Sequence, residues 1–274
     1  MKRTMKALIG LGALCTALPI WAVAPGHISR SKKSIFRGIN YAHRGLHSRD
    51  RSIPENSLAA FRRAAEKGYG IELDVQVSRD GKVVVFHDNT LDRVCRVHAH
   101  VGDLTWAELS NLRLCGTEEH IPLFSEVLTQ IQGCAALIVE LKNGPRNREL
   151  CEKTYALLKG YPGNVCIESF NPLIVMWFRF HAPELVRGQL ATTRKNYADD
   201  GITGLQAFIL HNTLLNFLAR PQFIAYRIGY RPLSVRFCTL LGAMNIGWTS
   251  HEPRNEKGRD AVIFEFYRPR QRYR

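Results

Sequence analysis

The sequence lacks several patterns that would place it in a familiar class of protein at once. Its seven cysteines include no pair separated by two residues, so neither a structural zinc site nor a thioredoxin-like redox motif is indicated. Their odd number also argues against a complete set of intrachain disulfides. There is no glycine-rich phosphate loop of the Rossmann or P-loop type and no repeat array. The composition, with 45% hydrophobic residues, is that of an ordinary globular protein.

Acidic residues are scarce relative to basic ones, with 24 against 38 and a formal net charge of +14. A basic excess is typical of proteins that bind nucleic acid. Here the basic residues are spread along the chain, with a local excess near both ends, and no nucleic-acid motif accompanies them. We therefore expect no nucleic-acid partner. The arginines at every second position of 268–274 indicate a tail that is either simply solvated or attracted to an anionic membrane surface.

The N-terminal segment combines basic residues with one apolar run. Residues 7–24 follow Lys2, Arg3 and Lys6, and their 18 residues fall just within the roughly 17–25 that span a bilayer. A cleaved signal peptide is the rival interpretation, but Pro25 would follow the cleavage site and obstruct it. We therefore predict that residues 1–25 are a membrane anchor or uncleaved signal, followed by a basic linker at 26–38. The protein would then be a single-pass membrane protein, and the side of the membrane on which its main domain lies is left open.

Three carboxylates and one lysine lie on segments whose remaining residues are largely apolar and predict buried strands. Residues 70–77 alternate strictly, which places Glu72 and Asp74 on one face of a strand. A turn and a second predicted strand, the buried apolar run 83–86, lead into His87. A third strand pattern at 137–142 places Glu140 and Lys142 on one face.

These charges are either the solvated faces of amphipathic strands or parts of one site. Buried charges are unfavourable unless they are paired or bound to a metal. Three carboxylates that meet in one cleft would require a cation, and hard oxygen ligands suit Ca²⁺ or Mg²⁺ better than zinc. Strand and helix patterns alternate along the chain, which predicts an α/β fold with a parallel sheet, either closed or open. Toward the C-terminus, the segments 207–210, 223–226, 245–248 and 261–266 compete as candidate strands.

The motifs together resemble the glycerophosphodiester phosphodiesterase family. The resemblance runs from about residue 41 to just beyond 248 and is densest in the first half. The segments that carry it are 43–45 (His-Arg-Gly), 54–57 (Pro-Glu-Asn-Ser), 60–61, 72–75 (Glu-Leu-Asp-Val), 80–81, 87–88 (His-Asp), 91, 121–122, 140–142 (Glu-Leu-Lys), 169–170 (Ser-Phe) and 248–249 (Trp-Thr).

The resemblance implies a (β/α)8 TIM barrel over residues 39–268 with a basic tail at 269–274. The size fits, because one such barrel commonly takes about 250 residues. The long segment 89–120 implies a small insertion after the third strand. The family usually has a Thr-Asp pair near the end, where this chain reads Phe-Glu-Phe-Tyr at 264–267, which leaves the register of the last strand open.

Carried over residue by residue, the resemblance implies a metal-dependent phosphodiesterase. His43 and His87 would be the catalytic acid and base in an order that is left open, and Arg44 and Lys142 would bind the phosphate. A metal site for one Ca²⁺ or Mg²⁺ is implied at Glu72, Asp74 and Glu140.

The expected activity is hydrolysis of glycerophosphodiesters to glycerol phosphate and an alcohol. Phe170 and Trp248 would line the substrate pocket, unless they only pack in the core. Two alternatives are open: cleavage of lysophospholipids by the same chemistry, or a non-catalytic membrane protein that binds phosphorylated headgroups. The complete set of charged residues argues against a decayed site. The sequence does not indicate an oligomeric state.

Overall fold

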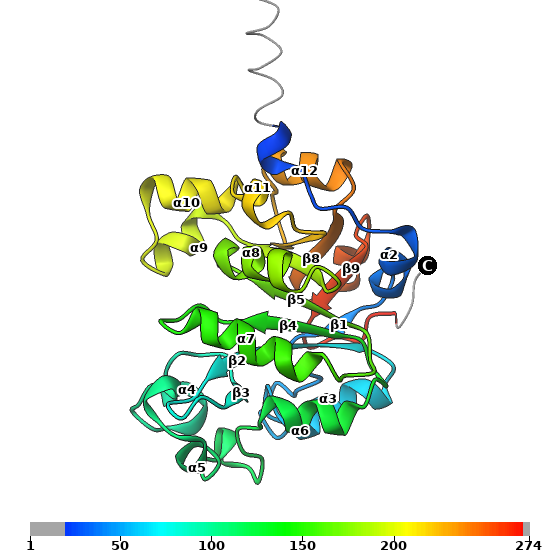
Figure 1. Ribbon diagram of the computed structural model, residues 1–274. Coiled ribbons are helices and arrows are strands. Elements are labelled where there is room, and N and C mark those ends of the chain that lie inside the picture. Colours follow the sequence, from blue (N-terminus) through cyan, green and yellow to red (C-terminus); the bar gives the residue numbers. More distant parts are fainter. Residues whose placement is uncertain (1–19, 271–274) are drawn as a thin grey trace, which may run out of the picture.

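Eight parallel strands close into a barrel in the computed structural model, which describes residues 20–270 (Figure 1). The strands follow one another around the barrel, and β1 closes it by pairing with both β2 and β9. The predicted TIM barrel is confirmed. Its strands are β1 Tyr41–Ala42, β2 Gly70–Val77, β4 Leu137–Leu141, β5 Val165–Ser169, β6 Val186–Ala191, β7 Phe223–Arg227, β8 Met244–Ser250 and β9 Ala261–Phe264.

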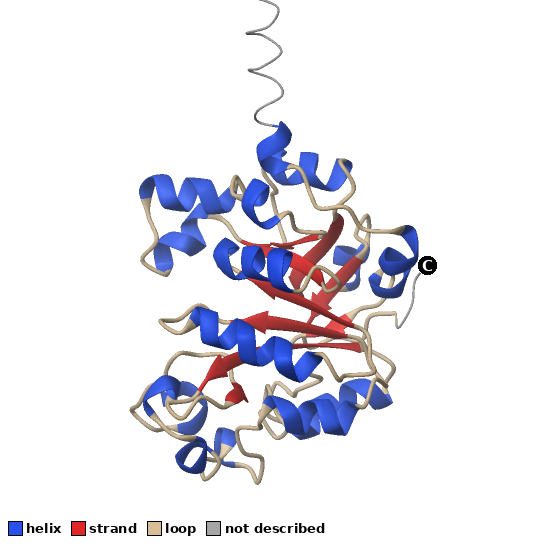
Figure 2. Cartoon of the chain, in the orientation of Figure 1, coloured by secondary structure: helices blue, strands red, loops and turns tan. Residues whose placement is uncertain are grey.

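Helices lie outside the strands (Figure 2). The strand residues that face outward, such as Leu73 and Val139, pack with apolar residues of the surrounding helices in one large cluster. Ser57 caps the first of these helices by accepting a hydrogen bond from the Ala60 amide. The helices are α3 Leu58–Glu66, α6 Phe124–Ile131, α7 Asn147–Leu158, α8 Pro172–His181, α9 Arg194–Asp199, α10 Gly204–His211, α11 Asn216–Ala219 and α12 Leu233–Leu240, with a short 3-10 helix, η3 Pro253–Glu256, between β8 and β9.

The strand predicted at 83–86 lies outside the barrel. β3 Val83–Val85 pairs antiparallel with β2, so these two strands form a hairpin, and the insertion follows the hairpin rather than a barrel strand. The insertion has its own apolar cluster, which includes Leu91 and Leu109. A capping box between Thr105 and Glu108 begins one short helix of the insertion. The insertion elements are α4 Asp92–Cys95, η1 Val101–Asp103, α5 Trp106–Leu109 and η2 Leu114–Gly116.

The segment expected to be a linker contains a helix. Ser29 caps α2 Arg30–Phe36, and Phe36 packs in the apolar cluster that fills the N-terminal part of the barrel interior together with Tyr41. Gly188 on β6 leaves room in this layer, because a Cβ atom there would overlap the ring of Phe223. The N-terminal part of the barrel interior is therefore packed, and any cavity inside the barrel must lie at the other end.

Residues 207–210 were a candidate strand, but they lie in α10. A short apolar run without periodicity does not distinguish a buried strand from a helix, and the β6–β7 connection uses this run as part of a helix. The candidate strands at 223–226, 245–248 and 261–266 overlap β7, β8 and β9.

Within residues 20–270, no helix is long and apolar enough to cross a membrane. This finding contradicts the predicted single-pass anchor, and the membrane location that depended on it, for the part of the span that the structure describes. Residues 1–19, which hold most of the predicted span, lie outside the described residues, as do residues 271–274 of the basic tail. Attraction of that tail to a membrane surface stays a prediction.

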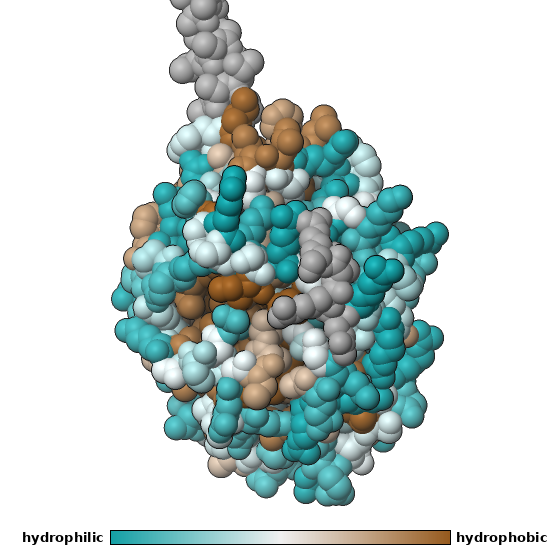
Figure 3. Space-filling view, turned by 90° about the vertical axis from the view of Figure 1, so that its right-hand side faces the viewer, coloured by the Kyte–Doolittle hydropathy of each residue, from teal (hydrophilic) through white to brown (hydrophobic). Residues whose placement is uncertain are grey.

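Apolar surface gathers where the described chain begins. Figure 3 shows it at the top of the molecule, where Figure 1 places the first described residues beside α12. Trp21 stacks on Phe217 with ring centroids 5.0 Å apart. The exposed apolar residues of the two segments are Ile20, Trp21, Leu233, Phe237, Leu240 and Leu241.

Candidate active site

The predicted site residues come together at the C-terminal ends of the strands. Because all eight strands run in the same direction, their C-terminal ends meet at one face of the barrel. The cavity at this face has a volume of about 620 Å³. The predicted residues that line it are His43, Arg44, Glu72, His87, Glu140, Lys142, Phe170 and Trp248. Asp74, the remaining one, is fully buried beneath them, within reach of Glu72 and Glu140.

Three carboxylates form a cluster that fits a cation. Each of Glu72, Asp74 and Glu140 offers an oxygen, and these oxygens all lie within 4.8 Å of one another. Oε1 of Glu72 is buried without a hydrogen-bond partner, and Oδ1 of Asp74 has only an ion pair with Lys142. Buried acceptors of this kind are rare unless something satisfies them, so the donor set suits a hard divalent cation.

Lysine and asparagine side chains hold the cluster together. Nζ of Lys142 lies 2.8 Å from Oε1 of Glu140 and 3.3 Å from Oδ1 of Asp74. Nδ2 of Asn56 donates to Oδ2 of Asp74 at 2.8 Å. Burial alone would raise the pKa of Asp74, but Lys142, His87 and Arg44 hold it below its usual range.

The pKa of Glu72 shifts in the opposite direction. Burial, together with the nearby charges of Asp74 and Glu140, raises its pKa well above the usual value. The backbone amide of Arg44 donates to its Oε2 at 2.9 Å. The cluster therefore combines one carboxyl group whose pKa is lowered with one whose pKa is raised.

Arg44 reaches the cavity from the turn that follows β1. The backbone of Arg44 has a φ of 54° and that of Gly45 a φ of 78°, so two successive residues turn in the left-handed region. Nη1 of Arg44 donates to Oε1 of Glu55 at 2.7 Å, and its Nε lies 3.6 Å from Oδ2 of Asp74. This fork of donors beside the carboxylate cluster is suited to an anion with several oxygens.

His43 is held between two carboxylates. Its Nδ1 lies 2.5 Å from Oε1 of Glu265, and its Nε2 lies 3.8 Å from Oε2 of Glu72. Burial and the charge of Arg44 lower the pKa of His43 to about 4 in this arrangement, despite the opposing effect of Glu265. Glu265 is shared with a second histidine, because its Oε1 also lies 3.5 Å from Nε2 of His47.

His87 also has a carboxylate on Nδ1, but that carboxylate is neutralised. Nδ1 of His87 lies 2.6 Å from Oδ1 of Asp88, and Nε of Arg93 donates to Oδ2 of Asp88 at 2.6 Å. Arg93 also donates to both oxygens of Glu55, the partner of Arg44, at 2.7 and 2.8 Å. A chain of ion pairs thus connects α4 in the insertion to both His87 and Arg44.

One side of the cavity is aromatic. Phe170 and Trp248 meet edge to face with centroids 5.5 Å apart, and Phe170 meets Tyr197 in the same manner at 6.4 Å. Nε1 of Trp248 donates to the carbonyl of Ala225 at 3.0 Å, which fixes the ring against β7. Both residues predicted for the substrate pocket therefore have surface at the cavity as well as packing contacts.

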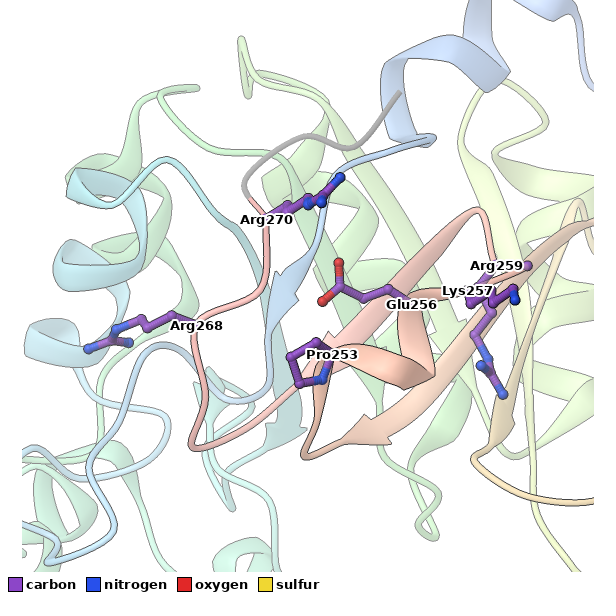
Figure 4. Close-up of a pocket in the computed structure, with 7 residues that line it drawn as sticks. Pro253, Glu256, Lys257, Arg259, Arg268 and Arg270 are labelled. Carbon is purple, nitrogen blue, oxygen red and sulfur yellow. The ribbon is translucent and has the colours of Figure 1, made fainter.

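A second cavity lies apart from these residues. It has a volume of about 550 Å³ and is lined by η3 and the residues after β9 (Figure 4). Nδ2 of Asn40, at the N-terminal end of β1, contacts Oε2 of Glu256 and the carbonyl of Arg270. Figure 4 shows the side chains of Arg268, Arg270 and Lys257 pointing in different directions rather than toward one point. This cavity is not part of the site.

Residues 43–259 match the sequence model of the Glycerophosphoryl diester phosphodiesterase family. The chain belongs to this family. A glycerophosphodiester phosphodiesterase of Caldanaerobacter subterraneus is 37% identical over 162 residues, which are 54% of this chain and 65% of that protein.

Solved structures share the fold. The structure of a protein named as a putative glycerophosphoryl diester phosphodiesterase, from Silicibacter pomeroyi, superposes with a TM-score of 0.70 at 22% identity. It covers 85% of this chain and 93% of that one. A phosphodiesterase from Oleispira antarctica, solved with the product sn-glycerol-3-phosphate, gives a TM-score of 0.69 at 23% identity. The shares covered are 85% of this chain and 94% of that one.

Three residues at the site were missed by the sequence reasoning. Glu168, at the cavity beside Glu140, is almost fully buried, and burial with the charges of Glu140 and Asp74 raises its pKa well above the usual value. Strand alternation at 165–169 and after 264 could have placed Glu168 and Glu265 inside the barrel. No local pattern indicates Arg93, because its partners come from other loops.

Proposed function

We propose that this member of the family hydrolyses glycerophosphodiesters to glycerol phosphate and an alcohol, with the help of a divalent cation. The observation that carries the proposal is that His43 and His87 line the same cavity as the carboxylate cluster, Arg44 and Lys142. A phosphodiester is an anion that resists attack, so its hydrolysis needs charge neutralisation, a base for the nucleophile and an acid for the leaving alkoxide. Each requirement has a residue in this cavity.

Arg44 and Lys142 would bind the phosphate oxygens. Both side chains already lie against the carboxylates, so the phosphate would enter a site that the barrel has oriented in advance. Glu72, Asp74 and Glu140 would hold one Ca²⁺ or Mg²⁺, and a bound cation supplies further positive charge to the phosphate oxygens. This cation also offsets the repulsion among the three buried carboxylates.

Each of the two histidines would accept or donate a proton through its Nε2. In both, Nδ1 faces a carboxylate, which fixes the ring and leaves Nε2 as the atom available to substrate. One histidine accepts the proton of the attacking hydroxyl and the other donates a proton to the alcohol that leaves. The attacking hydroxyl belongs either to water or to the substrate's own glycerol, in which case a cyclic phosphate is opened by water in a second step.

The related proteins support this proposal. The relative from Caldanaerobacter subterraneus carries the name of the activity, and the Oleispira antarctica structure is described with sn-glycerol-3-phosphate as its product. The carboxylate cluster gives independent support, because buried acids in such numbers are rarely retained without a cation or partner.

The decisive experiment measures release of glycerol phosphate from glycerophosphocholine by the purified protein. We expect turnover with Mg²⁺ or Ca²⁺ and little turnover after prolonged treatment with chelator. Calorimetric titration with each metal alone should show one site in the normal protein and none in Asp74→Ala. Binding of glycerol phosphate without any turnover would instead support the non-catalytic alternative, and full turnover in excess chelator would exclude the role of the cation.

A further inference from the structure

The outward face of α12 is apolar. Leu233, Phe237, Leu240 and the C-cap residue Leu241 recur at the spacing of one helical face, and they are between 44% and 79% exposed. The inward face, which includes Val235, packs in the core. A surface helix normally presents polar residues to solvent on its outward face. The exposed face of α12 is therefore unusual and indicates a surface that something else covers.

The first described residues extend this surface. Ile20 and Trp21 are also exposed. Asn216 of α11 joins their segment to α12, because its Nδ2 donates to the carbonyl of Val23 at 3.2 Å and lies 3.4 Å from Sγ of Cys238. Figure 3 shows the resulting apolar surface at the top of the molecule. We call the exposed residues of the two segments the apolar patch: Ile20, Trp21, Leu233, Phe237, Leu240 and Leu241.

Three arginines lie beside the apolar patch. The guanidinium of Arg220 lies over the ring of Trp21, 5.1 Å from its centroid, and Nη1 donates to the carbonyl of Trp21. Arg179 and Arg187 donate to main-chain carbonyls of residues 217–219 at the end of α11. Within residues 20–270, the hydrogen bonds of these arginine side chains all go to carbonyls and none goes to a carboxylate. Carbonyls orient these cations but do not neutralise them.

The positive charge near the patch is not balanced locally. Burial and the charge of Arg179 lower the pKa of Arg187 to about 10, and both effects also lower the pKa of Arg220. The patch is formed by two stretches of sequence, 1–49 and 201–251, that contain no aspartate or glutamate. The apolar patch therefore has a positively charged border.

We propose that the apolar patch inserts into one leaflet of an anionic lipid bilayer, with the neighbouring arginines against the lipid phosphates. Contact with a single leaflet requires no helix that spans the membrane. Tryptophan favours the interface between lipid and water, and basic residues are attracted to anionic lipids. The inference goes beyond the proposed function and does not depend on it.

A second copy of the chain fits the apolar patch less well. A symmetric contact between two patches would bring the arginines of both copies together without any acid from either patch. An anionic surface supplies the opposite charge that the patch lacks. The chain before residue 20 also joins the body of the protein at this patch, and residues 7–19 carry no charged side chain. The sequence next to the patch is therefore compatible with lipid.

Tryptophan fluorescence tests the contact with the full chain and vesicles of brominated phosphatidylglycerol. Trp21 is in the patch, whereas Trp106 belongs to α5, at the opposite end of the molecule from α12 in Figure 1. Bromine should quench part of the fluorescence of the normal protein and of Trp106→Phe, and this part should be lost in Trp21→Phe. Adding Phe237→Trp to the Trp21→Phe protein should restore the quenching, because Phe237 lies on the outward face of α12.

Affinities for vesicles, measured by sedimentation, test the two parts of the contact separately. Leu233→Ser with Leu240→Ser should lower the affinity for phosphatidylglycerol vesicles by about tenfold or more, because two leucines no longer leave water. Arg236→Gln, on the exposed side of α12, should lower it about fivefold, the usual share of one basic residue near an anionic surface. The control is Arg62→Gln on α3, which is exposed and lies far from α12 in Figure 1, and its affinity should be normal. All four side chains are at the surface, so these variants should fold.

The outcomes decide the inference. If Phe237→Trp does not restore quenching, lipid contacts only the N-terminal segment, and the role of α12 is excluded. Normal affinity of the double leucine variant, or equal affinity for vesicles of phosphatidylcholine alone, also overturns the inference. A protein that sediments as a dimer without vesicles, and as a monomer after Leu233→Ser with Leu240→Ser, would assign the patch to a second copy instead.

Discussion

The two halves of the barrel share one backbone pattern but present different walls to the active site. The first half, from β1 to β4, supplies both histidines, the phosphate-binding candidates and the carboxylate cluster. The second half supplies mainly apolar surface, of which Leu190, Trp248 and Ile263 line the cavity. Under the proposed function, the same fold would separate the chemistry of the phosphate from the recognition of what is attached to it.

The concentration of charge in one half has a physical reason. A buried carboxylate is unfavourable alone, but neighbours can share a few cations and donors. Lys142 contacts two of the acids, and Arg44 contacts a third through its backbone amide. Glu168, on β5 at the border between the halves, has no such partner for its Oε2. Substitutions in one half should therefore affect activity in a different way from substitutions in the other half.

Removal of a carboxylate from the cluster should have the largest effect. Asp74→Ala or Glu140→Ala should lower kcat for every substrate on the order of 10⁴-fold, because a bound cation supplies several kcal/mol of transition-state stabilisation. The double variant should be little worse than either single one, since residues that act as a unit are not additive. Kinetics with glycerophosphocholine would show this, and additive losses would contradict a single shared site.

Loss of a catalytic histidine candidate should have the next largest effect on the rate. His87→Ala should reduce the rate by about 10²–10⁴, the usual share of general acid–base catalysis. The control is His98→Ala, because the side chain of His98 is fully exposed and contacts only Asp92 among the acids. Steady-state kinetics of the two variants should differ by at least tenfold. A normal rate for His87→Ala would exclude its proposed role.

Substitution of Arg93 should lower activity although Arg93 does not line the cavity. Arg93→Ala removes the partner of both Asp88 and Glu55, so the orientation of His87 and Arg44 should loosen and activity should fall about 10–100-fold. Arg79→Ala is a matched control, since Arg79 pairs with the exposed Glu108 instead. Equal activity in the two variants would show that the ion-pair chain does not support the site.

The smallest effect is expected in the apolar half. Phe170→Leu removes the edge-to-face contacts with Trp248 and Tyr197, which are worth about 0.5–1.5 kcal/mol. KM should rise about tenfold or less, whereas kcat should stay within about twofold of normal. A large loss of kcat would mean that the apolar wall participates in the chemistry and that the two halves are not separable.

The barrel and the core of the site were predictable because their signals are local. Strict alternation around Glu72 and Asp74, and the short Glu-Leu-Lys pattern at 140–142, place side chains on faces without any knowledge of distant residues. The resemblance to the family then predicted that the sheet closes into a barrel. Three predictions failed where local pattern was ambiguous: 83–86 as a barrel strand, 207–210 as a strand, and the N-terminal anchor.

The sequence by itself determined which strands carry the charges, because a period of two assigns each side chain to one face of its strand. The tertiary structure decided which charges meet. Glu265 contacts His43 across 222 positions of the chain, and Arg93 joins two loops that no spacing rule connects. The aromatic wall of Phe170, Tyr197 and Trp248 is likewise a product of three segments that meet only when the barrel closes. Pairings of this kind depend on closure and packing, to which residues remote in sequence contribute together.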